Sequence, residues 1–265
     1  MKEQLVNAAD RDRISQPAVS VCMPAFHAGE TIGAAVASVL SQDVALELLI
    51  VLDGTDEKTQ ALLESLKDDR RVRVLRNEER LGAARSRNRA VAQAKAPFIA
   101  FLDADDEWAQ GKLRKQMNIL SRSGRVLCCT ARELLRPDGT HTGRVIPVSS
   151  VIRYEDLLKT NSINCSSVVV RTEAMRRFPM EHEDSHEDYI AWLKILREYG
   201  PADGLNEPML YYRLSSGGKS GSKLKSARMT FRAYRYMGFS LPRSMYCFLN
   251  YALRGAQKYL ASRIR

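Results

Sequence analysis

The chain has 265 residues, of which 45% are hydrophobic, and this is enough to bury a core in one large domain or in one domain with a C-terminal extension. The composition therefore excludes a chain that is disordered as a whole. The net charge of +10 is uneven, because residues 213–265 contain 12 Lys or Arg and no Asp or Glu. This distribution indicates a near-neutral globular body joined to a basic segment that meets an anionic surface.

Cysteine usage and the N-terminal residues predict the compartment. The five cysteines form no C-x-x-C pair and no zinc-type spacing, so we expect no disulfide framework, no structural metal site and a reducing cytosol. Residues 1–17 mix acids and bases where a secretory signal needs an apolar run, and no stretch of about 18 uncharged apolar residues occurs. We therefore expect a lead segment at 1–17 and a protein that is neither exported nor membrane-spanning.

The first half of the sequence alternates apolar runs with amphipathic segments. The runs predict strands at 18–23, 46–52, 72–75 and 97–102, and helical spacing predicts helices at 31–40, 57–66 and 83–95. Such alternation indicates an α/β fold whose central sheet is mainly parallel and covered by helices on both faces. Because such sheets bind ligands beyond the carboxyl ends of their strands, we expect the chemistry in the loops at 24–30, 53–56 and 103–106.

After residue 124 the pattern loosens, and we expect this half to shape an acceptor site. It predicts strands near 125–133 and 166–171, a short helix near 153–159, and a helix at 187–199. Residues 215–218 (Ser-Ser-Gly-Gly) predict a hinge. The expected organisation is a domain at 18–213 followed by a basic helical tail at 214–265.

An acidic motif, Asp103-Ala104-Asp105-Asp106, directly follows the apolar run FIAFL. Three carboxylates at a strand end repel one another unless a cation or hydrogen-bond donors neutralise them. Oxygen ligands of this kind suit Mg²⁺ or Mn²⁺, which keep open positions for a substrate diphosphate. The alternative is an acidic N-cap for a helix that begins near Trp108.

A second acidic pair, Glu187-Asp188, stands where the helix at 187–199 begins. A carboxylate there acts either as a general base or as a favourable charge at a helix start. Residues 182–186 match the H-E-x-x-H pattern of zinc proteases, but acidic neighbours replace the apolar residues that bury such histidines. We therefore interpret that match as accidental.

Arg85, Arg87 and Arg89 follow Gly82 at a predicted helix start. Backbone donors and guanidinium groups there could meet a phosphate, and the alternative is a solvated basic face.

Five segments, taken in order, resemble the inverting family 2 glycosyltransferases of GT-A fold. They are VSVCMPAF at 19–26, AAVASVLSQ at 34–42, LLIVLDGT at 48–55, the run from LGAARSRNRA to FLDADDEW at 81–108, and HEDYIAWLKIL at 186–196. The resemblance covers about residues 18–213 and implies a Rossmann-like GT-A domain. It also implies transfer of a sugar from a nucleotide diphosphate donor to an acceptor hydroxyl, with Mn²⁺ or Mg²⁺. The sequence from residue 187 onward looks like bacterial enzymes that build capsular, teichuronic-type or other surface polysaccharides, which implies a UDP-sugar donor and a glycan or lipid-linked glycan acceptor.

The resemblance also implies a role for each candidate site residue. Asp188 matches the catalytic base, which would deprotonate the acceptor hydroxyl opposite the leaving group and so invert the anomeric carbon. Asp105 matches the direct metal ligand, and Asp103 a contact to the ribose or to a metal-bound water. The remaining implied donor contacts are Pro24, Ala25, Phe26 and Glu30 lining the nucleotide pocket, Asp53 at the base, Arg87 in the A-R-N signature, and Arg213, near the diphosphate, closing over the donor with Tyr211 and Tyr212.

The sequence departs from the family pattern at two of these positions. Many members carry two acids after the second strand, whereas Leu52 stands first here and leaves Asp53 alone. Ala84, Ser86 and Ala90 also vary the surroundings of Arg87. The contact between Asp53 and the base is the assignment that the first departure affects most.

The tail predicts an amphipathic helix from about 243 to 262. Its apolar positions are Met245, Phe248, Leu249, Ala252, Ala256, Tyr259 and Leu260, and its polar side carries Arg243, Asn250, Arg254 and Lys258. A basic helix of this kind can lie on an anionic leaflet, which predicts a cytoplasmic protein that is peripheral on the inner face of the cell membrane. The alternative is that the apolar side packs on the domain or on a second copy in a homo-oligomer.

Three other functions compete with a transferase. A sugar-nucleotide-binding protein without turnover would share the fold, but the acids at 103, 105 and 188 argue against it. A nucleic-acid-binding protein would explain the basic tail, yet the sequence contains no recognition helix or RNA-binding strand motif, so no nucleic acid partner is expected. A sugar nucleotidyltransferase should carry a glycine-rich phosphate loop where this chain has Pro24-Ala25-Phe26-His27.

Overall fold

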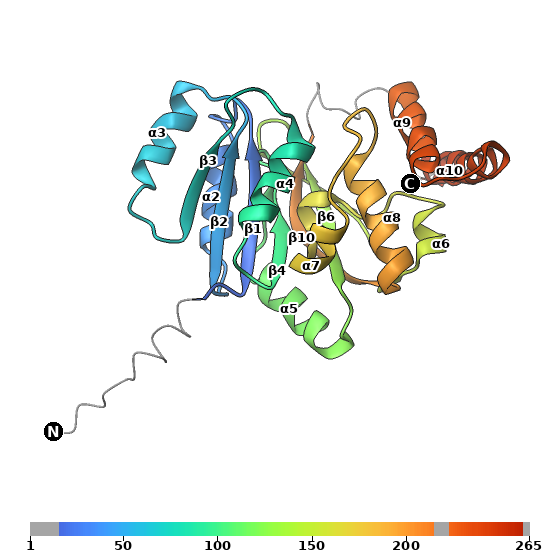
Figure 1. Cartoon of the computed structure of the whole chain (residues 1–265), viewed down its shortest axis with the longest axis horizontal. Coiled ribbons are helices and arrows are strands. Elements are labelled where there is room, and N and C mark those ends of the chain that lie inside the picture. The colour runs from blue at the N-terminus through green and yellow to red at the C-terminus, as the bar shows by residue number, and fades with distance from the viewer. Residues whose placement is uncertain (1–15, 215–222, 262–265) are drawn as a thin grey trace.

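The computed structural model describes residues 16–214 and 223–261 (Figure 1). Most of the predicted lead segment and the predicted hinge at 215–218 lie outside the described residues. Within them the chain forms a central sheet of ten strands. Figure 1 shows helices on both sides of this sheet and two further helices, α9 and α10, beside α8.

The first half of the sheet is parallel. β1 (Val19–Ala25) lies between β2 (Leu46–Leu52) and β4 (Phe98–Phe101), and β3 (Val72–Arg76) pairs with β2 at the edge. β1, β2 and β4 are largely apolar, as buried parallel strands require, whereas the edge strand β3 also carries Arg73 and Arg76. Each ends at the same edge of the sheet, so the loops that follow β1, β2 and β4 are brought together.

The second half is mixed. β9 (Val169–Arg171) runs antiparallel between β4 and β6 (Leu127–Leu135), and β10 (Ala202–Arg213) runs parallel to β6. Short strands complete it: β5 (Glu107–Trp108), β7 (His141–Ile146) and β8 (Val151–Ile152). The sequence analysis missed β7, β8 and β10 because they are short or interrupted by polar residues. β7 forms a hairpin with β6, whereas β8 and β10 pair with strands far away in the chain.

Two hydrophobic clusters cover the two faces of the sheet. One contains α4 (Ala83–Gln93), α7 (Thr172–Arg177) and α8 (Glu187–Tyr199), and the other contains α2 (Ile32–Leu40), α3 (Glu57–Ser65) and α5 (Lys112–Ser123). Residues alternate between the clusters along each strand, with Cys22 and Leu49 in the first and Val21 and Leu48 in the second. The predicted α/β class with a helix-covered central sheet is therefore confirmed.

The acidic motif at 103–106 does not cap a helix, so that alternative is wrong. Glu107 and Trp108 form β5, which pairs with Tyr211 and Leu210 of β10, and α5 begins only at Lys112. The acids therefore occupy a loop between two strands, open to a ligand.

The tail is less separate from the body than its charge suggests. α9 (Lys223–Tyr236) packs on α8, and α10 (Leu241–Ala261) packs on α9. Tyr234, Phe239 and Cys247 belong to the same core cluster as Tyr189 and Trp192 of α8. The predicted boundary at 213–214 therefore marks where the chain becomes basic, but the hydrophobic core continues across it.

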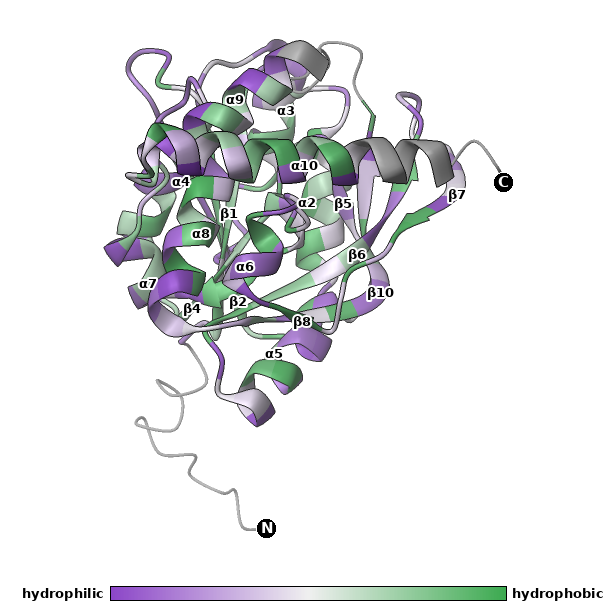
Figure 2. Ribbon diagram, turned by 90° about the vertical axis from the view of Figure 1, so that its right-hand side faces the viewer, coloured by the Kyte–Doolittle hydropathy of each residue, from purple (hydrophilic) through white to green (hydrophobic). Residues whose placement is uncertain are grey.

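The helix α10 exposes most of the described residues on its predicted apolar side, namely Met245, Leu249 and Ala252, but not Phe248. Ser244 and Cys247 are buried and Phe248 is half-buried against Phe231, whereas Leu241, Met245, Tyr246, Leu249 and Leu253 are all exposed. Phe248 was therefore assigned to the wrong side; Ala256, Lys258, Tyr259 and Leu260 have side chains outside the described set. Figure 2 shows α10 lying across the front of the molecule with apolar segments along its length. No helix within the described ranges combines the length and the apolar character needed to cross a bilayer.

Candidate functional site

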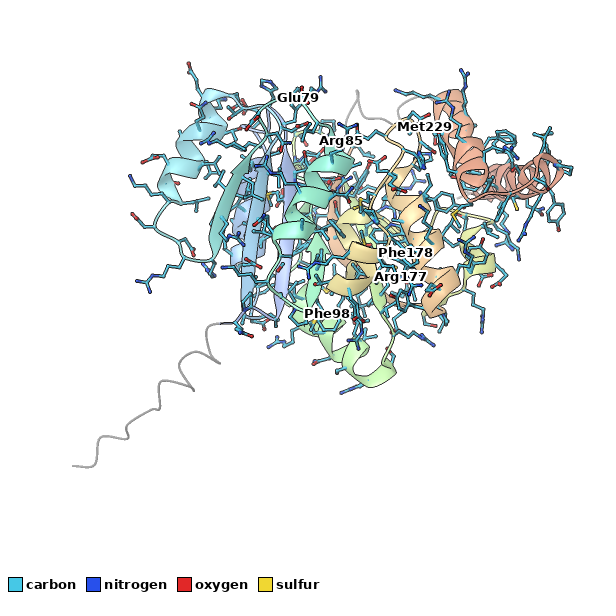
Figure 3. All side chains as sticks on the ribbon, viewed as in Figure 1. Glu79, Arg85, Phe98, Arg177, Phe178 and Met229 are labelled. Atoms are coloured by element: carbon cyan, nitrogen blue, oxygen red, sulfur yellow. The ribbon has the colours of Figure 1, made fainter. Side chains whose placement is uncertain are left out.

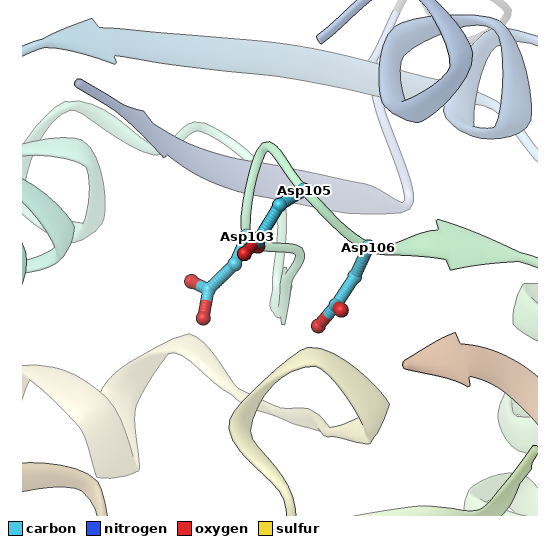
Figure 4. Close-up of side chains that lie close together, drawn as sticks. All are labelled: Asp103, Asp105 and Asp106. Carbon is cyan, nitrogen blue, oxygen red and sulfur yellow. The ribbon is translucent and has the colours of Figure 1, made fainter. Parts of the chain in front are cut away.

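The acidic loop after β4 gathers three carboxylates (Figure 4). Oxygen atoms of Asp103, Asp105 and Asp106 lie within 4.8 Å of one another. Burial, with the charge of Asp103 as a second cause, raises the pKa of Asp105 to about 6. Burial also raises the pKa of Asp106 well above its usual value, helped by the charges of Asp105 and Asp103. The cluster thus holds excess negative charge, which a divalent cation would neutralise.

Arg213, at the end of β10, anchors this loop. Its backbone N–H donates to Asp106 Oδ1 at 2.9 Å, its Nε donates to the Asp105 carbonyl at 2.9 Å, and its Nη2 pairs with Glu107 at 2.7 Å. Arg213 therefore holds the loop from behind, and it lines neither of the two cavities described below. Its predicted contact with the diphosphate stays a prediction.

A cavity of about 350 Å³ opens beyond the ends of β1, β2 and β4. Phe26 lies at its mouth with 45% of its surface exposed, and the Arg80 guanidinium lies 4.1 Å from its ring centroid. The candidate donor-site residues that share this cavity are Pro24, Ala25, Phe26, Asp53, Arg87, Asp103 and Asp105. Glu30 and Arg213 are the exceptions: Glu30 is exposed and paired with Lys58 outside the cavity, and Arg213 lies behind the acidic loop.

Asp53 is buried, and hydrogen bonds occupy both of its oxygens. It accepts from Asn77 Nδ2 at 2.8 Å, from the Leu81 N–H at 2.7 Å and from the Gly82 N–H at 2.7 Å. These bonds hold the loop before α4 against the end of β2. Gly82 has φ of 85°, and a Cβ there would collide with the Glu183 carboxylate, so this turn requires glycine.

Arg87 connects the acidic loop to the start of α8. Its guanidinium is buried and contacts Asp103 Oδ1 at 2.5 Å and Glu187 Oε1 at 3.4 Å. The arginines at 85 and 89, by contrast, are exposed: Arg85 lies on the outer side of α4 (Figure 3), and Arg89 donates to the Arg76 carbonyl at 2.6 Å. Of the three, Arg87 is therefore the one placed to act in the site.

A second cavity, of about 360 Å³, lies on the other side of Arg87 and Asp103. Asp188 lines it and is half-buried, with Oδ1 accepting from the Tyr189 N–H at 2.8 Å. Burial raises the pKa of Asp188 to about 6, and the charge of Glu187 contributes. Such a carboxylate is ionised near neutral pH but holds a proton more readily than an exposed aspartate, as a general base must.

The second cavity also contains residues that the sequence analysis did not assign, together with Tyr212, which it assigned to the donor side. Arg132, Asn161, Tyr212 and Tyr251 lie along it, and Tyr251 comes from α10. Tyr212 therefore belongs on this side, although its sequence-based role was to close over the donor. A charged residue inside the apolar run at 125–133 was the one available signal for Arg132; Tyr251 gave none.

The H-E-x-x-H match has no zinc-protease geometry. His182 has φ of 66° and stacks on Tyr236 at 3.7 Å, and His186 only precedes the first turn of α8. The two histidines therefore do not share a helix face.

Comparison with known proteins identifies the family. The family model described as glycosyl transferase family 2 matches residues 20–182. A putative teichuronic acid biosynthesis glycosyltransferase, TuaG of Bacillus subtilis, is 33% identical over 92% of this chain and 98% of its own length. WfaP of Escherichia coli, named as a UDP-Glc:alpha-D-GlcNAc-diphosphoundecaprenol beta-1,3-glucosyltransferase, is 30% identical over 92% of this chain and 96% of its own length.

The fold has a matching solved structure. Residues 1–349 of S. aureus TarS, crystallised with UDP-GlcNAc, superpose with a TM-score of 0.69 at 17% identity, covering 88% of this chain and 71% of that one. This likeness supports the GT-A fold, and the sequence matches carry the family. The chain therefore belongs to glycosyl transferase family 2 and is a glycosyltransferase of GT-A fold.

Proposed function

We propose that the chain transfers a sugar from a UDP-sugar to a hydroxyl of a lipid-linked or nascent cell-surface glycan, with inversion at the anomeric carbon. The observation that carries the proposal is the arrangement of two cavities that meet at Arg87 and Asp103. The first cavity ends at the acidic loop, and the second contains Asp188. A donor and an acceptor bound on the two sides would bring their reacting atoms together at this junction.

The acidic loop suits a divalent cation. Carboxylate oxygens are the ligands that Mn²⁺ and Mg²⁺ prefer. The pKa of Asp105 is raised first by burial and second by the charge of Asp103, so a cation beside these two carboxylates would be favourable. Asp105, with Asp103 beside it, would hold the ion. When bound, the ion supplies positive charge to the diphosphate leaving group.

Asp188 would move the proton. Its ionised carboxylate takes the proton of the acceptor hydroxyl, and the hydroxyl oxygen forms a bond to the anomeric carbon. The bond between that carbon and the diphosphate oxygen breaks at the same time, and its electron pair leaves with UDP. Attack on the face opposite the leaving group inverts the anomeric carbon.

The chemical class of the substrates comes from the relatives. The WfaP name states a UDP-glucose donor and a diphosphoundecaprenol-linked acceptor, and WfaP aligns over almost its full length. The TuaG name points to a cell-wall polysaccharide. We therefore propose a UDP-sugar donor and an acceptor carried on a lipid diphosphate.

A lipid-linked acceptor places the enzyme at a membrane. The exposed side of α10 carries Leu241, Met245, Leu249 and Leu253, which are four residues apart and form one stripe, and the sequence from residue 213 onward contributes twelve basic residues and no acid. Apolar insertion together with attraction to anionic lipid would hold the protein peripherally on the cytoplasmic face of the membrane.

The test is a donor screen followed by analysis of the product. Purified protein with Mn²⁺ and a panel of nucleotide sugars should release UDP from one UDP-sugar, and NMR of the transferred sugar should show an inverted anomeric centre. Asp188→Asn should leave UDP binding nearly intact and reduce transfer by about 10² or more. Asp184→Asn is the matched control, because Asp184 is exposed and contacts Arg232 and Tyr236. If Asp188→Asn transfers sugar at the wild-type rate, Asp188 is not the general base. If the protein binds UDP but turns over no donor, it is a sugar-nucleotide-binding protein rather than a transferase.

A further inference from the structure

Arg132 lines the second cavity, and no carboxylate among the described residues forms an ion pair with its guanidinium. It projects from β6, and its Nε is buried with no hydrogen-bond partner among the residues that the structure describes. Its neighbours are the Tyr212 ring, whose centroid lies 5.8 Å from Cζ, and the carboxyl group of Asp106. Burial lowers the pKa of Arg132 because these neighbours compensate the charge only in part.

The other arginines near the site are paired. Arg87 contacts Asp103 and Glu187, and Arg213 contacts Glu107. Both therefore have their charge balanced within the protein. Arg87 Nε also lacks a hydrogen-bond partner among the described residues, but carboxylates contact both of its terminal nitrogens. Arg132 has no such carboxylate contact within the described residues, so its donors remain available to a ligand that enters the cavity.

A hydrogen-bond acceptor in the same cavity is also unpartnered. Asn161 Oδ1 is buried and accepts no hydrogen bond within the described part of the chain. A buried donor and a buried acceptor that lack partners destabilise the fold, and a ligand that pairs both recovers that free energy on binding. A ligand that pairs both atoms would present an oxyanion to the Arg132 guanidinium and a hydroxyl group to Asn161 Oδ1.

We propose that Arg132 binds an oxyanion of the acceptor, namely the phosphate that joins its first sugar to the lipid, while Asn161 accepts a hydrogen bond from a sugar hydroxyl. The planar guanidinium offers paired N–H donors that match phosphate oxygens. This assignment rests on the proposed transfer reaction in taking the second cavity as the acceptor site.

The position of Arg132 assigns the anion to the acceptor rather than to the donor. Arg132 lines the cavity that contains Asp188, whereas the cavity that contains Asp105 is lined by other residues. Arg87 and Asp103, which line both, stand between them. The donor diphosphate, bound beside Asp105, would lie on the far side of that pair.

The helix that is proposed to lie on the membrane, α10, contributes to one side of the second cavity. Tyr251 lines the cavity and belongs to α10, whose opposite side bears the exposed stripe from Leu241 to Leu253. An acceptor phosphate at Arg132 would thus lie on the protein side of the helix that is proposed to rest on lipid. The lipid chain of the acceptor would leave the cavity towards the same surface.

Binding can be tested without turnover. The probes are α-D-GlcNAc 1-phosphate, its neutral counterpart methyl α-D-GlcNAc, methyl phosphate, and methyl glucuronoside as a carboxylate. Ligand-observed NMR titrations are run with UDP and Mg²⁺ saturating the donor cavity. Wild-type protein should bind the two phosphates at least tenfold more tightly than the neutral glycoside, and Arg132→Gln should lose this difference. Tighter binding of the glucuronoside than of the phosphates would overturn the assignment to a phosphate.

Two variants control the experiment. Arg144→Gln removes an exposed arginine from the neighbouring strand β7 and should bind all four probes as the wild type does. Arg132→Lys should keep part of the phosphate preference, because it retains charge without the planar fork. Arg132→Gln should melt at or above the wild-type temperature, because it removes a buried charge that lacks a direct partner.

Two further results would overturn the proposal. One is equal binding of phosphates and the neutral glycoside by the wild type, and the other is a loss of UDP affinity in Arg132→Gln, which would place Arg132 with the donor. Failure of the proposed function is distinguishable from both. A protein that hydrolyses no UDP-sugar but prefers phosphates through Arg132 would keep the anion site and lose the transferase assignment.

Discussion

Arg87 brings together two acidic groups that lie far apart in the chain. Its guanidinium contacts Asp103, which follows β4, and Glu187 at the start of α8, which lies 100 residues after Arg87. Because it is buried, both contacts are shielded from water and fix its orientation. This single side chain therefore sets the position of the candidate metal loop relative to the candidate base.

The raised pKa of Asp188 predicts the acid side of the pH profile. A base must be ionised, and a folded-state pKa of about 6, above the ordinary value of 3.8, means that Asp188 becomes protonated as the pH falls through 6. With Mn²⁺ and donor saturating, transfer should fall about tenfold per pH unit below that point, with a slope of one. At limiting metal the slope should become steeper, because Asp105 also has a pKa of about 6 and protonation would weaken metal binding. A flat rate between pH 5 and pH 7 would contradict the assignment.

Asp105 predicts the metal dependence of donor binding. In the wild type, UDP should bind at least about tenfold more tightly with Mn²⁺ than with EDTA, because Asp105 and Asp103 would hold the ion and the ion would supply positive charge to the diphosphate. Asp105→Asn should remove this difference, as calorimetry can measure. Asp68→Asn, which changes an exposed aspartate outside both cavities, should preserve it. Equal UDP affinity of the wild type with and without the ion would exclude the metal role.

Among the elements, α10 has two sides that face different surroundings. One side, with Ser244 and Cys247, is buried on the protein, and the other exposes the stripe from Leu241 to Leu253. The sequence pattern showed an amphipathic helix but could not assign its sides, because both of them carry apolar residues. The packing against α9 decides which side remains for a partner.

The exposed stripe predicts binding to anionic vesicles. Leu249→Ser with Leu253→Ser should reduce sedimentation with phosphatidylglycerol-rich liposomes by at least about tenfold, because a buried leucine contributes about 1.5–3 kcal/mol. Val145→Ser, which alters an exposed apolar residue on β7, should have no effect. Added salt should weaken binding of the intact protein, since basic residues contribute to it. If the wild type ignores the vesicles and is a dimer in solution, the stripe covers a second copy of the chain.

At the scale of the whole molecule, the basic tail completes the core of the body. Tyr234 and Cys247 are buried in the cluster that includes Tyr189, and the Tyr234 hydroxyl donates to the Leu158 carbonyl at 2.7 Å. The charge of the tail and its packing therefore have separate roles. The basic residues suit an anionic surface outside the protein, and the buried apolar side chains stabilise the body.

Removal of residues 241–265 should destabilise the protein. The truncation exposes part of this core, and the loss of several large buried contacts costs about 2–5 kcal/mol, or a fall in melting temperature of about 5–15 °C for a chain of this size. Below that temperature UDP should still bind, because the donor cavity lies between β1, β2 and α4. Transfer to an acceptor should suffer more than donor hydrolysis, since Tyr251 is lost from the second cavity. An unchanged melting temperature would show that the tail folds independently of the body.

The sequence by itself determined the order of the strands and helices in the first half, the acidic loop after β4 and the placement of Asp188 at the start of α8. These features follow from local periodicity and from the shared edge at which parallel strands end. Only the tertiary structure placed Glu30 outside the donor cavity, joined Arg87 to Asp103 and Glu187, brought Arg132 into the second cavity, and selected the exposed side of α10. Each of these depends on pairing or packing between segments distant in the chain, and local sequence patterns carry no information about which distant surfaces meet.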